Sequence, residues 1–364
     1  MKKIYIVGEA KGAYRTQAFV KMLLDHPDQF RVKYNSWSYS RRITRALRSL
    51  FINPFSILFS DVVYVPALNV GVDILYEVLL ARLFNKEVII EYYVSVYDTV
   101  VLDRKMFSPS SMMAKLAMTY DQLLVKAADK VIFLNACEYN RYAEISKLSI
   151  DADKVRIIPL CIERRGKLTP VKQNPPGPFS MCWWGSYLPL HGLEKIIDSV
   201  KLLIDSGEDV RLYIFGNNPQ KAEKYMKTVN GYGLNDQIVF NDEYSFSNGL
   251  LEPFLLSNCQ LAFGLFGESD KAKNVIPNKI LDAVAMKCPI ITGPSNALPD
   301  YFDGINDLFY CDSTPEAIVA EVKKIITMDQ FNLETRTEIA YEIFDEHFTI
   351  EKYREKMMQL LTEE

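Results

Sequence analysis

Short apolar runs that suit buried strands alternate with helix-like segments along almost the whole chain. In the first half these runs lie at residues 3–8, 61–66, 87–93, 130–135 and 154–160. After the first run, Phe19, Val20, Leu23 and Leu24 recur at the spacing of a helix. Continuous apolar strands separated by helices are typical of parallel sheets covered on both faces. The alternation therefore predicts a doubly wound α/β fold.

A segment without periodicity interrupts this alternation. Residues 163–179 are rich in proline, glycine and charge, which predicts a linker between domains. The alternation then resumes, with strand-like runs at 180–185, 210–216, 237–242, 259–266, 289–292 and 308–311. Two doubly wound domains joined by one linker leave a cleft between them, and ligands of such sheets bind at the carboxyl ends of the strands.

Composition narrows the class of protein. The 364 residues suffice for two domains, and the net charge of -4 argues against a nucleic-acid partner. No apolar run approaches the roughly 18 residues of a membrane span, and the N-terminus is interpreted as a first strand. The six cysteines form no C-x-x-C pair and there are three histidines, so we expect an intracellular protein without structural metal.

One segment of the first half interleaves arginines with large apolar residues. In "RRITRALRSLFINPFSILF", Arg41, Arg42, Arg45 and Arg48 stand among leucines, isoleucines and phenylalanines. This pattern suits peripheral attachment to an anionic lipid surface. The alternative is a helix packed on its own domain with its arginines in solvent. Attachment would place a cytoplasmic protein on the inner face of the cytoplasmic membrane.

Two strand-end loops of the first half are candidates for ligand contacts. Gly8 and Gly12 fit a tight turn after the first strand, where backbone N–H groups can meet a phosphate or sugar oxygen, although a plain strand-to-helix connection explains them equally. The loop after residues 87–93 bears acids and bases that suit an acceptor site, or that are simply solvated. The acceptor-side candidates are Arg15, Ser95, Asp103 and Arg104, with Asp98 as a catalytic candidate.

Two loops of the second half point to an anion. "WWGSYLPLHGLEKII" places Gly185, Ser186 and His191 before a helix, so that His191 is a phosphate partner, a catalytic group or a turn residue. "NVIPNKILDAVAMKCPIIT" places Lys279 in a turn at the start of a short helix, with Asp282 one turn further along. A helix N-terminus with a lysine beside it favours a negatively charged ligand.

These segments resemble the nucleotide-sugar-binding half of GT-B glycosyltransferases, specifically the retaining family 4 type (glycosyl transferases group 1). The most specific piece is "GLFGESDKAKNVIPNKILDAVAMKCPIITG", which resembles a donor-site motif. "VRIIPLCIE", "WGSYLPLHGLEKIIDSVKLL" and "LYIFGNNP" resemble the family's interdomain segment, glycine loop and G-x-G-P turn. The resemblance spans the whole second half and is weaker over the first.

The resemblance implies two Rossmann-like domains facing across a cleft. Residues 1–165 would bind the acceptor and 166–345 the nucleotide-sugar donor, while a C-terminal helix in 346–364 would pack back on the first domain. The donor would be a UDP- or GDP-linked sugar, with no cofactor and no metal required. Lys279 would meet the diphosphate and Asp282 the ribose hydroxyls, and Asp98, Lys279 and His191 would be catalytic. The donor-binding candidates are Gly8, Gly12, Gly185, Ser186, Gly216, Asn217, Glu243, Tyr244, Asn274, Pro277, Asn278, Lys279 and Asp282.

The chain departs from the family pattern at three places. The family usually has an E-x7-E pair, but here Asn274 takes the first place and Asp282 the second. Ser186 and His191 stand near where many members have arginine and lysine. The frequent histidine of the first domain is absent, and Asp98 is the nearest candidate for its role.

The function implied by the resemblance is a retaining glycosyltransferase. It would move a sugar to a hydroxyl of a glycan or lipid-linked glycan in bacterial surface polysaccharide or glycoconjugate synthesis. One alternative is a nucleotide-sugar epimerase of the same build, which three scattered histidines disfavour. Another is a non-catalytic nucleotide-sugar-binding protein, which the missing first acid of the pair favours.

Overall fold

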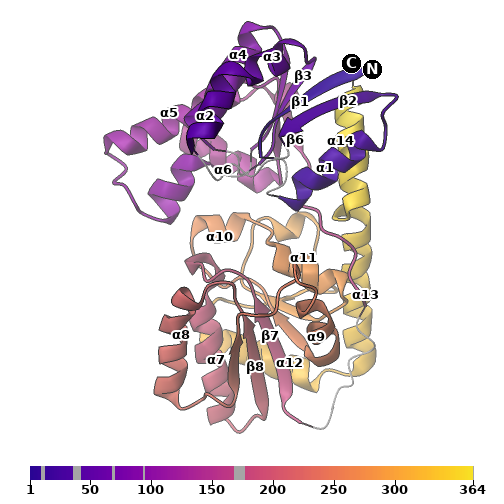
Figure 1. Cartoon of the computed structure of the whole chain (residues 1–364). Coiled ribbons are helices and arrows are strands. Elements are labelled where there is room, and N and C mark those ends of the chain that lie inside the picture. Colours follow the sequence, from indigo (N-terminus) through magenta and orange to yellow (C-terminus); the bar gives the residue numbers. More distant parts are fainter. Residues whose placement is uncertain (10–12, 36–41, 68–69, 93–94, 168–176, 364) are drawn as a thin grey trace. The chain divides into compact units, whose positions relative to one another are not determined.

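The computed structural model describes residues 1–9, 13–35, 42–67, 70–92, 95–167 and 177–363, with the side chains of 35 and 42–45 left aside. The chain divides into two compact units (Figure 1). Unit 1 consists of Met1–Cys161 and Ile350–Glu364, and unit 2 of Ile162–Thr349. Each unit is built around one parallel sheet.

Unit 1 contains a six-stranded sheet in the order β2-β1-β3-β4-β5-β6, and every pair of neighbours is parallel. The strands are β1 (Lys2–Glu9), β2 (Phe30–Asn35), β3 (Val62–Val65), β4 (Glu87–Glu91), β5 (Lys130–Phe133) and β6 (Val155–Ile157). Strand β2 is an edge strand that the sequence analysis did not predict. Its sequence "FRVKYN" alternates apolar and polar residues and so lacks the continuous apolar run of the central strands.

Helices cover both faces of this sheet. They are α1 (Tyr14–Leu24), α2 (Arg42–Phe51), α3 (Asn53–Leu58), α4 (Val72–Leu83), α5 (Met112–Ala127), α6 (Ala136–Ser146) and α14 (Ile350–Thr362), with a short π-helix at Asp98–Asp103 and a 3-10 turn at Ala152–Lys154. On one face Phe19 of α1 and Met357 of α14 pack on Ile4 and Ile6. On the other face α4, α5 and α6 cover Tyr5, Val7 and their neighbours.

Unit 2 contains a second six-stranded parallel sheet, in the order β12-β11-β10-β7-β8-β9. The strands are β7 (Phe179–Trp184), β8 (Val210–Phe215), β9 (Ile238–Asn241), β10 (Leu261–Phe263), β11 (Ile290–Thr292) and β12 (Phe309–Tyr310). The helices are α7 (Leu193–Asp205), α8 (Pro219–Tyr232), α9 (Leu251–Asn258), α10 (Asp270–Asn274), α11 (Asn278–Ala285), α12 (Pro315–Thr327) and α13 (Gln330–His347), with 3-10 turns at Pro189–His191 and Leu298–Asp300.

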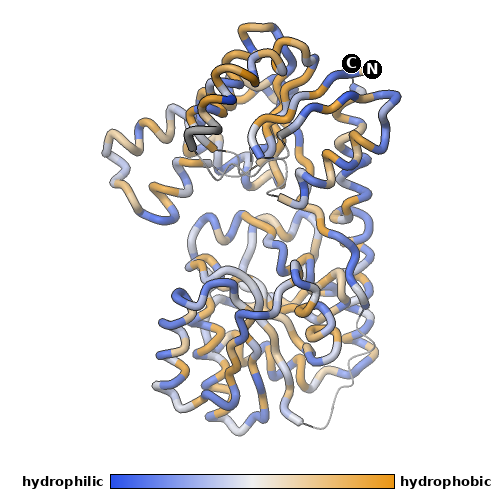
Figure 2. Tube along the Cα trace, in the orientation of Figure 1, coloured by the Kyte–Doolittle hydropathy of each residue, from blue (hydrophilic) through white to orange (hydrophobic). Residues whose placement is uncertain are grey.

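The predicted doubly wound α/β fold is confirmed in both units. Hydropathy along the trace shows why, because the strands are mostly hydrophobic while the helices alternate between hydrophobic and hydrophilic residues (Figure 2). In unit 2 the core gathers Trp183 and Met181 of β7 with Ile196 and Val200 of α7 and Val322 of α12. A strand buried on both faces and a helix buried on one face produce these two patterns.

Side-chain caps fix where several helices begin. The side-chain oxygen atoms of Ser111, Asn135, Asn218 and Thr314 accept hydrogen bonds from the backbone N–H three residues later, at the starts of α5, α6, α8 and α12. Within the described part of the chain, no helix is both long and apolar enough to cross a membrane.

Candidate functional site

The order of strands in unit 2 defines where a ligand binds. The chain starts this sheet at β7, continues outward through β8 and β9, and then returns to the other side of β7 with β10. In open parallel sheets such a reversal of direction leaves a crevice at the carboxyl ends of the two adjacent strands. The loops that follow β7 and β10, at residues 185–192 and 264–277, meet at this point.

Close backbone contacts lock these two loops together. The backbone N–H of Phe266 donates to the carbonyl of His191 at 3.1 Å, and that of Gly267 donates to Leu190 at 3.2 Å. Gly192 has a φ of +62°, and a Cβ there would lie 2.5 Å from the carbonyl carbon of Phe266. Only glycine fits this position. The side chain of His191 is therefore held on a fixed backbone.

Gly185, His191 and Lys279 come together at the crevice. Gly185 has a φ of +140°, and a Cβ there would lie 3.3 Å from His191 Cε1 and 3.5 Å from Lys279 Nζ. Three candidates taken from two loops far apart in sequence thus share one small volume. Ser186 follows Gly185, and its carbonyl accepts a hydrogen bond from the N–H of Leu188 at 2.7 Å.

Lys279 is buried without a hydrogen-bond acceptor. Its side chain is 4% exposed, and among the described residues its Nζ has no hydrogen-bond partner. The Nζ lies 4.1 Å from the centroid of a Trp183 ring. Burial lowers the pKa of Lys279 well below its usual value. A buried amine of this kind gains free energy from any anion that reaches it.

His191 is buried beside this lysine. Within the described structure its Nδ1 has no hydrogen-bond partner, and its ring packs edge-on against Trp183. Burial, and then the positive charge of Lys279, lower the pKa of His191 to about 2, while a hydrogen bond with the backbone of Ser186 opposes this shift. The imidazole is therefore uncharged at neutral pH and can donate one hydrogen bond.

Together Lys279 and His191 present two unsatisfied nitrogen atoms to one crevice. Buried polar atoms in folded proteins are nearly always hydrogen-bonded, so an unpaired pair of this kind is typical of a ligand site. Lys279 also stands in the first turn of α11, where a helix favours negative charge. Half-buried Pro277 precedes this helix as its N-cap, and exposed Asn278 opens it. The arrangement suits an anion such as a diphosphate.

Asp282 lies one turn further along α11 and is paired with Arg165. The guanidinium donates to Asp282 Oδ1 from Nη2 at 2.8 Å and from Nε at 3.2 Å. Burial raises the pKa of Asp282, and Arg165 and then the indole of Trp184 oppose this shift. Arg165 also lies 4.0 Å over the Phe246 ring and donates to Glu252 at 3.3 Å. The ion pair holds the carboxylate in place and leaves Oδ2 outside both guanidinium bonds.

The strand ends of β8 and β9 supply the remaining donor-side candidates. A Cβ on Gly216 would lie 2.1 Å from the hydroxyl oxygen of Tyr187, so glycine is needed there for Tyr187 to pack. Asn217 is exposed. Tyr244 stacks on Phe215 with 6.1 Å between ring centroids and an interplanar angle of 11°. Exposed Glu243 donates its backbone N–H to Asn241, as does Tyr244.

Asn274 occupies the end of α10 and is engaged by a neighbour. Its Oδ1 accepts a hydrogen bond from Asn296 Nδ2 at 2.9 Å. The amide thus fixes the loop after β11 to the loop that leads into α11. This contact gives Asn274 a structural role in the place where the family pattern has an acid.

The candidates on the loop after β4 belong to unit 1. Asp98 is 8% exposed, and its Oδ1 accepts from Arg141 Nη2 at 2.7 Å. Ser95 donates to buried Asp121 at 2.7 Å and accepts from the N–H of Asp98. Ser95 and Asp98 are therefore tied into the framework of this loop. Asp103 and Arg104 follow at the end of the π-helix, half-buried and exposed respectively.

Arg15 lies in the core of unit 1 rather than on a loop. It is 1% exposed, and its Nε donates to Glu91 Oε1 at 2.6 Å. Two further bonds reach the carbonyls of Ile158 and Pro159, and Tyr353 of α14 also donates to Glu91. Every one of these contacts is internal to the unit, so the guanidinium joins α1, β4 and α14.

Of three further predicted residues, the structure describes only Gly8. Gly8 has a φ of +77° near the end of β1, where the register between β1 and β2 shifts. A glycine there relieves the strain of a bulge. Gly12 and Arg41 lie outside the described residues, as does much of the predicted linker.

Sequence reasoning missed several residues that shape these sites. Arg165 lies at the edge of the predicted linker and Trp183 within a predicted strand, and the sequence pattern assigns neither of them to a site. Their positions depend on contacts with residues more than 90 positions away, which no local pattern reveals. Among the described residues, no group of three or more His, Cys, Asp or Glu side chains could hold a metal ion.

Residues 178–328 match the model of the family described as glycosyl transferases group 1. No curated protein sequence matches the chain.

Several solved structures share the fold over the whole length. They include Anabaena Alr3699/HepE in complex with UDP and glucose (TM-score 0.72, 12% identity, 100% of both chains). Sucrose-phosphate synthase from Thermosynechococcus elongatus has a TM-score of 0.68, with 12% identity over 99% of this chain and 98% of that one. The lipopolysaccharide outer core galactosyltransferase WaaB has a TM-score of 0.66, with 11% identity and 99% coverage of both. Residues 178–328 thus match a glycosyl transferases group 1 domain, the chain has the GT-B fold, and together these findings support a glycosyltransferase.

Proposed function

We propose that this glycosyltransferase moves a sugar from a UDP-linked donor to a hydroxyl of a glycan or lipid-linked glycan, with retention of the anomeric configuration. The acceptor would belong to the synthesis of a bacterial surface polysaccharide or glycoconjugate. The observation that carries the proposal is the pair of unsatisfied buried nitrogen atoms of Lys279 and His191, placed at the strand reversal of unit 2.

Lys279 is the residue that would stabilise the leaving group. When the bond between sugar and diphosphate breaks, negative charge grows on the departing oxygen atom. A preorganised amino group in a buried site, protonated once the diphosphate lies beside it, stabilises that charge together with the N-terminus of α11 far better than water does. Lys279 needs no reorganisation for this role, because the Trp183 ring already holds its Nζ in place.

His191 would donate a hydrogen bond to the donor without carrying a charge. With a pKa of about 2 it is not a general acid at neutral pH. Gly185 lacks a side chain, so a phosphate or sugar oxygen can approach both His191 and Lys279 closely. The proposed task of His191 is therefore orientation of the donor.

Asp282 would bind the ribose of the donor. A carboxylate has two oxygen atoms that accept hydrogen bonds, and Arg165 engages only Oδ1 in its two bonds. Tyr244, stacked on Phe215 at the end of β8, offers an aromatic surface for the base. UDP is favoured as the nucleotide because the structurally similar HepE was solved with UDP and with UDP-glucose.

The acceptor side would belong to unit 1. The sequence of α2 contains Arg42, Arg45 and Arg48 and no acid, which favours attachment to an anionic membrane. Lipid attachment would bring a lipid-linked acceptor within reach, and the protein would then act at the inner face of the cytoplasmic membrane. Asp98, paired with Arg141, is the proposed acidic group on the loop after β4.

Incubation of the protein with a panel of UDP- and GDP-sugars tests the donor and the reaction. Donor binding is read as a rise in melting temperature, and transfer as UDP released only when an acceptor glycan is present. The anomeric proton coupling of the product, measured by NMR, tests retention. An inverted product would contradict the retaining mechanism, and release of altered free sugar without acceptor would indicate an epimerase.

Flotation with vesicles tests attachment separately. The parent should float with anionic vesicles and dissociate as the salt concentration rises, since screening weakens the attraction. A variant with Arg42, Arg45 and Arg48 changed to Ser should stay at the bottom. Equal flotation of both proteins would show that these arginines do not drive attachment.

A further inference from the structure

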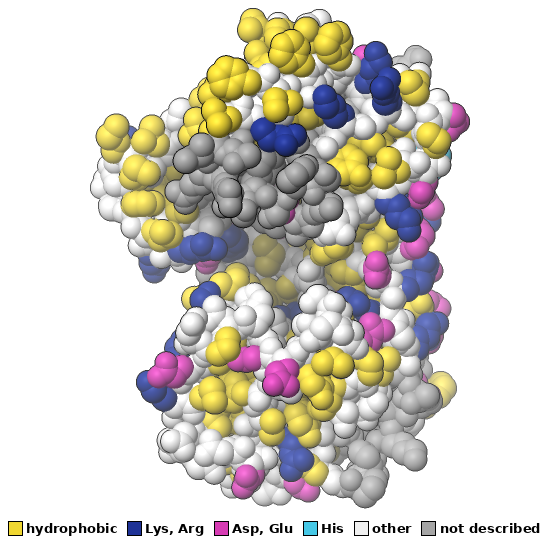
Figure 3. All heavy atoms as spheres, viewed as in Figure 1, with side chains coloured by type: hydrophobic (Ala, Val, Ile, Leu, Met, Phe, Trp, Pro, Cys, Tyr) yellow, Lys and Arg dark blue, Asp and Glu magenta, His cyan; other side chains and the backbone are white. Residues whose placement is uncertain are grey.

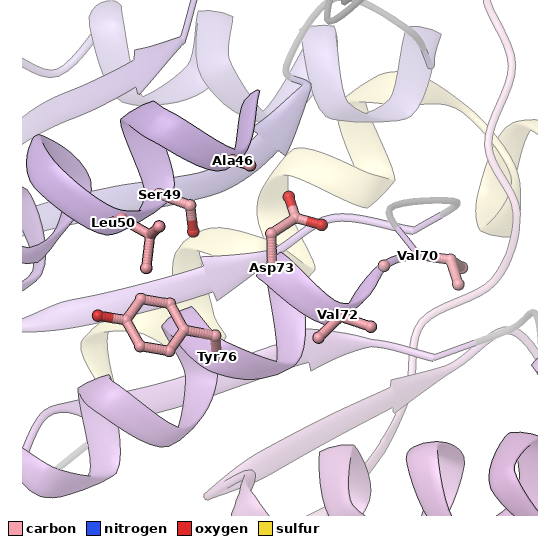
Figure 4. A pocket seen from close by; sticks show the side chains of 8 residues that line it. Ala46, Ser49, Leu50, Val70, Val72, Asp73 and Tyr76 are labelled. Carbon is pink, nitrogen blue, oxygen red and sulfur yellow. The ribbon is translucent and has the colours of Figure 1, made fainter. Parts of the chain in front are cut away.

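A pocket of about 660 Å³ opens in unit 1 between α2 and the start of α4 (Figure 4). Its wall on α2 is formed by Ala46, Ser49 and Leu50, and its wall on α4 and the preceding residues by Val70, Gly71, Val72, Asp73 and Tyr76. The side chains of Leu50 and Ser49 point toward the opposite wall, which carries Tyr76 and Asp73. The volume lies within the range of small-molecule sites in proteins.

The lining is apolar and open to solvent. Leu50 is 53% exposed and Val72 is 82% exposed, and Val70 and Tyr76 also belong to the exposed hydrophobic residues. Further exposed hydrophobic side chains lie on the same helix α2, on α3 and on α4, namely Leu47, Phe51, Phe55, Leu58, Leu79 and Leu83. Hydrophobic side chains gather over these helices in the space-filling view (Figure 3). Apolar surfaces of this extent on soluble proteins usually mark a site of interaction.

A buried polar network fixes the two walls of the pocket. Glu77 of α4 is 2% exposed, and its Oε1 accepts from Ser49 Oγ of α2 and from Asn53 Nδ2 of α3, both at 2.7 Å. Its Oε2 accepts from the hydroxyl of Tyr5 on β1 at 3.1 Å. These bonds anchor α2 and α3 to α4 and to the sheet. The pocket is therefore a built feature with fixed walls rather than a gap between loose helices.

Charge indicates which apolar ligand the pocket suits. Between residues 41 and 59 the sequence has four arginines and no acidic residue, and Arg48 of α2 lies one residue before Ser49 in the pocket wall. Asp73 is the acid of the lining, and Glu77 is buried beneath it. An excess of arginine over acidic residues beside an apolar surface favours the binding of molecules that combine an anionic group with a hydrocarbon chain.

We propose that this pocket binds the hydrocarbon chain of an anionic single-chain lipid, and that this lipid is the anchor of the glycosyl acceptor. The chain would lie between Leu50 and Val72, with its anionic group toward Arg48 of α2. Only the identification of the lipid as acceptor anchor rests on the proposed glycosyltransfer. Binding of the chain itself does not depend on activity.

A dansyl-labelled anionic single-chain amphiphile, used below its micelle concentration, tests the pocket directly. Its fluorescence should rise on binding to the full-length parent. Val72→Trp fills the pocket from the start of α4, and we expect roughly tenfold weaker binding from the loss of chain contacts. The matched control is Leu83→Trp, which adds the same ring to another exposed site of α4 outside the pocket lining and should bind as the parent does.

Three outcomes would overturn the proposal. These are failure of the parent to bind the probe, equal binding by Val72→Trp and Leu83→Trp, and a self-associating protein whose dimer Val72→Trp disrupts. UDP-induced stabilisation is measured on the same samples. If UDP still stabilises the protein but Val72→Trp does not weaken binding of the probe, the lipid pocket is rejected and the donor assignment is not. A missing UDP response in the parent would reject the donor assignment alone.

Competition by a polyprenyl phosphate and by a fatty acid separates two sources of the chain. Displacement of the dansyl probe by the polyprenyl phosphate at lower concentration supports a lipid-linked acceptor. Stronger displacement by the fatty acid would contradict the role of the pocket in acceptor binding.

Discussion

The Nζ of Lys279 lies 4.1 Å from the centroid of a Trp183 ring, so this buried amino group rests on an aromatic face and, among the described residues, has no hydrogen-bond acceptor. A cation–π contact contributes on the order of 0.5–2 kcal/mol, whereas burial of an amine without a partner opposes folding by a similar or larger amount. Burial of Lys279 thus lowers the stability of the free protein, and an anion that binds beside it would recover this free energy.

Replacement of Lys279 should separate stability from binding. Lys279→Met removes a buried amine without a partner, so we expect the free protein to become more stable by about 1–3 kcal/mol. The stabilisation by UDP, about 2.7 kcal/mol for the parent at a hundredfold excess over the dissociation constant, should be lost. Differential scanning fluorimetry with and without UDP measures both.

Lys227→Met provides the matched control, because Lys227 is exposed and pairs with exposed Glu223 at 2.7 Å. It should alter both quantities by less than about 1 kcal/mol. A Lys279→Met protein that is less stable than the parent and still responds to UDP would show that Lys279 is a structural residue.

His191 should make the stability of unit 2 depend on pH. Its pKa is about 2 in the folded protein against 6.5 usually, so the unfolded chain binds the proton first as the pH falls. The stability that this group contributes is therefore present above about pH 6.5 and is lost progressively below it. At about pH 5 the loss should be about 2 kcal/mol.

Urea unfolding of the parent and of His191→Gln at about pH 7.5 and about pH 5 checks this sign. The variant should lose less stability on acidification than the parent, and His26→Gln should behave as the parent does. Parallel pH dependence in all three proteins would mean that His191 is protonated in the fold.

Asp282 should contribute to affinity only when the nucleotide has ribose hydroxyls. A hydrogen bond to a charged group contributes roughly 1.5–3 kcal/mol, so Asp282→Asn should weaken UDP binding about ten- to a hundredfold. Binding of 2′,3′-dideoxy-UDP should change little. Titration calorimetry with both nucleotides measures the difference. Equal losses of affinity for the two nucleotides would show that Asp282 does not bind the ribose hydroxyls.

Gly216 is expected to serve packing rather than phosphate contact. A methyl group there meets the Tyr187 ring, so Gly216→Ala should destabilise the protein by about 1–3 kcal/mol. Gly231, in α8 and with open space around its Cβ position, is the comparison site, where Ala should be neutral or stabilising. Thermal unfolding compares the two. A stable Gly216→Ala protein with impaired UDP binding would instead support the donor-contact prediction.

The sequence predicts the two sheets well for a physical reason. Strands buried on both faces need continuous apolar runs, and such runs are visible in Ile4–Val7, Val88–Ile90 and Met181–Trp184. Edge strand β2 needs burial on only part of its surface, so its sequence contains the polar residues Arg31 and Lys33. It therefore lacks the continuous apolar run that identifies the central strands.

The candidate site could be predicted only where a short motif contained it. Lys279 and Asp282 stand in one turn-and-helix motif, and Gly185 and His191 in one loop. Arg165, which holds Asp282, comes from 117 residues earlier in the chain. The burial of Arg15 was equally hidden, since it depends on Glu91 and on Tyr353 near the C-terminus. Long-range pairing of charges leaves no local pattern.

The proton balance of UDP binding tests the central claim most directly. Calorimetric titration at about pH 9, in two buffers of different ionisation enthalpy, counts the protons exchanged while the diphosphate is already fully ionised. Burial lowers the pKa of Lys279 in the free protein, and a diphosphate beside it would raise that pKa again, so binding should take up protons. The account predicts uptake in the parent and none in Lys279→Met. Uptake that is absent from the parent, or equal in both proteins, would contradict contact between Lys279 and the diphosphate.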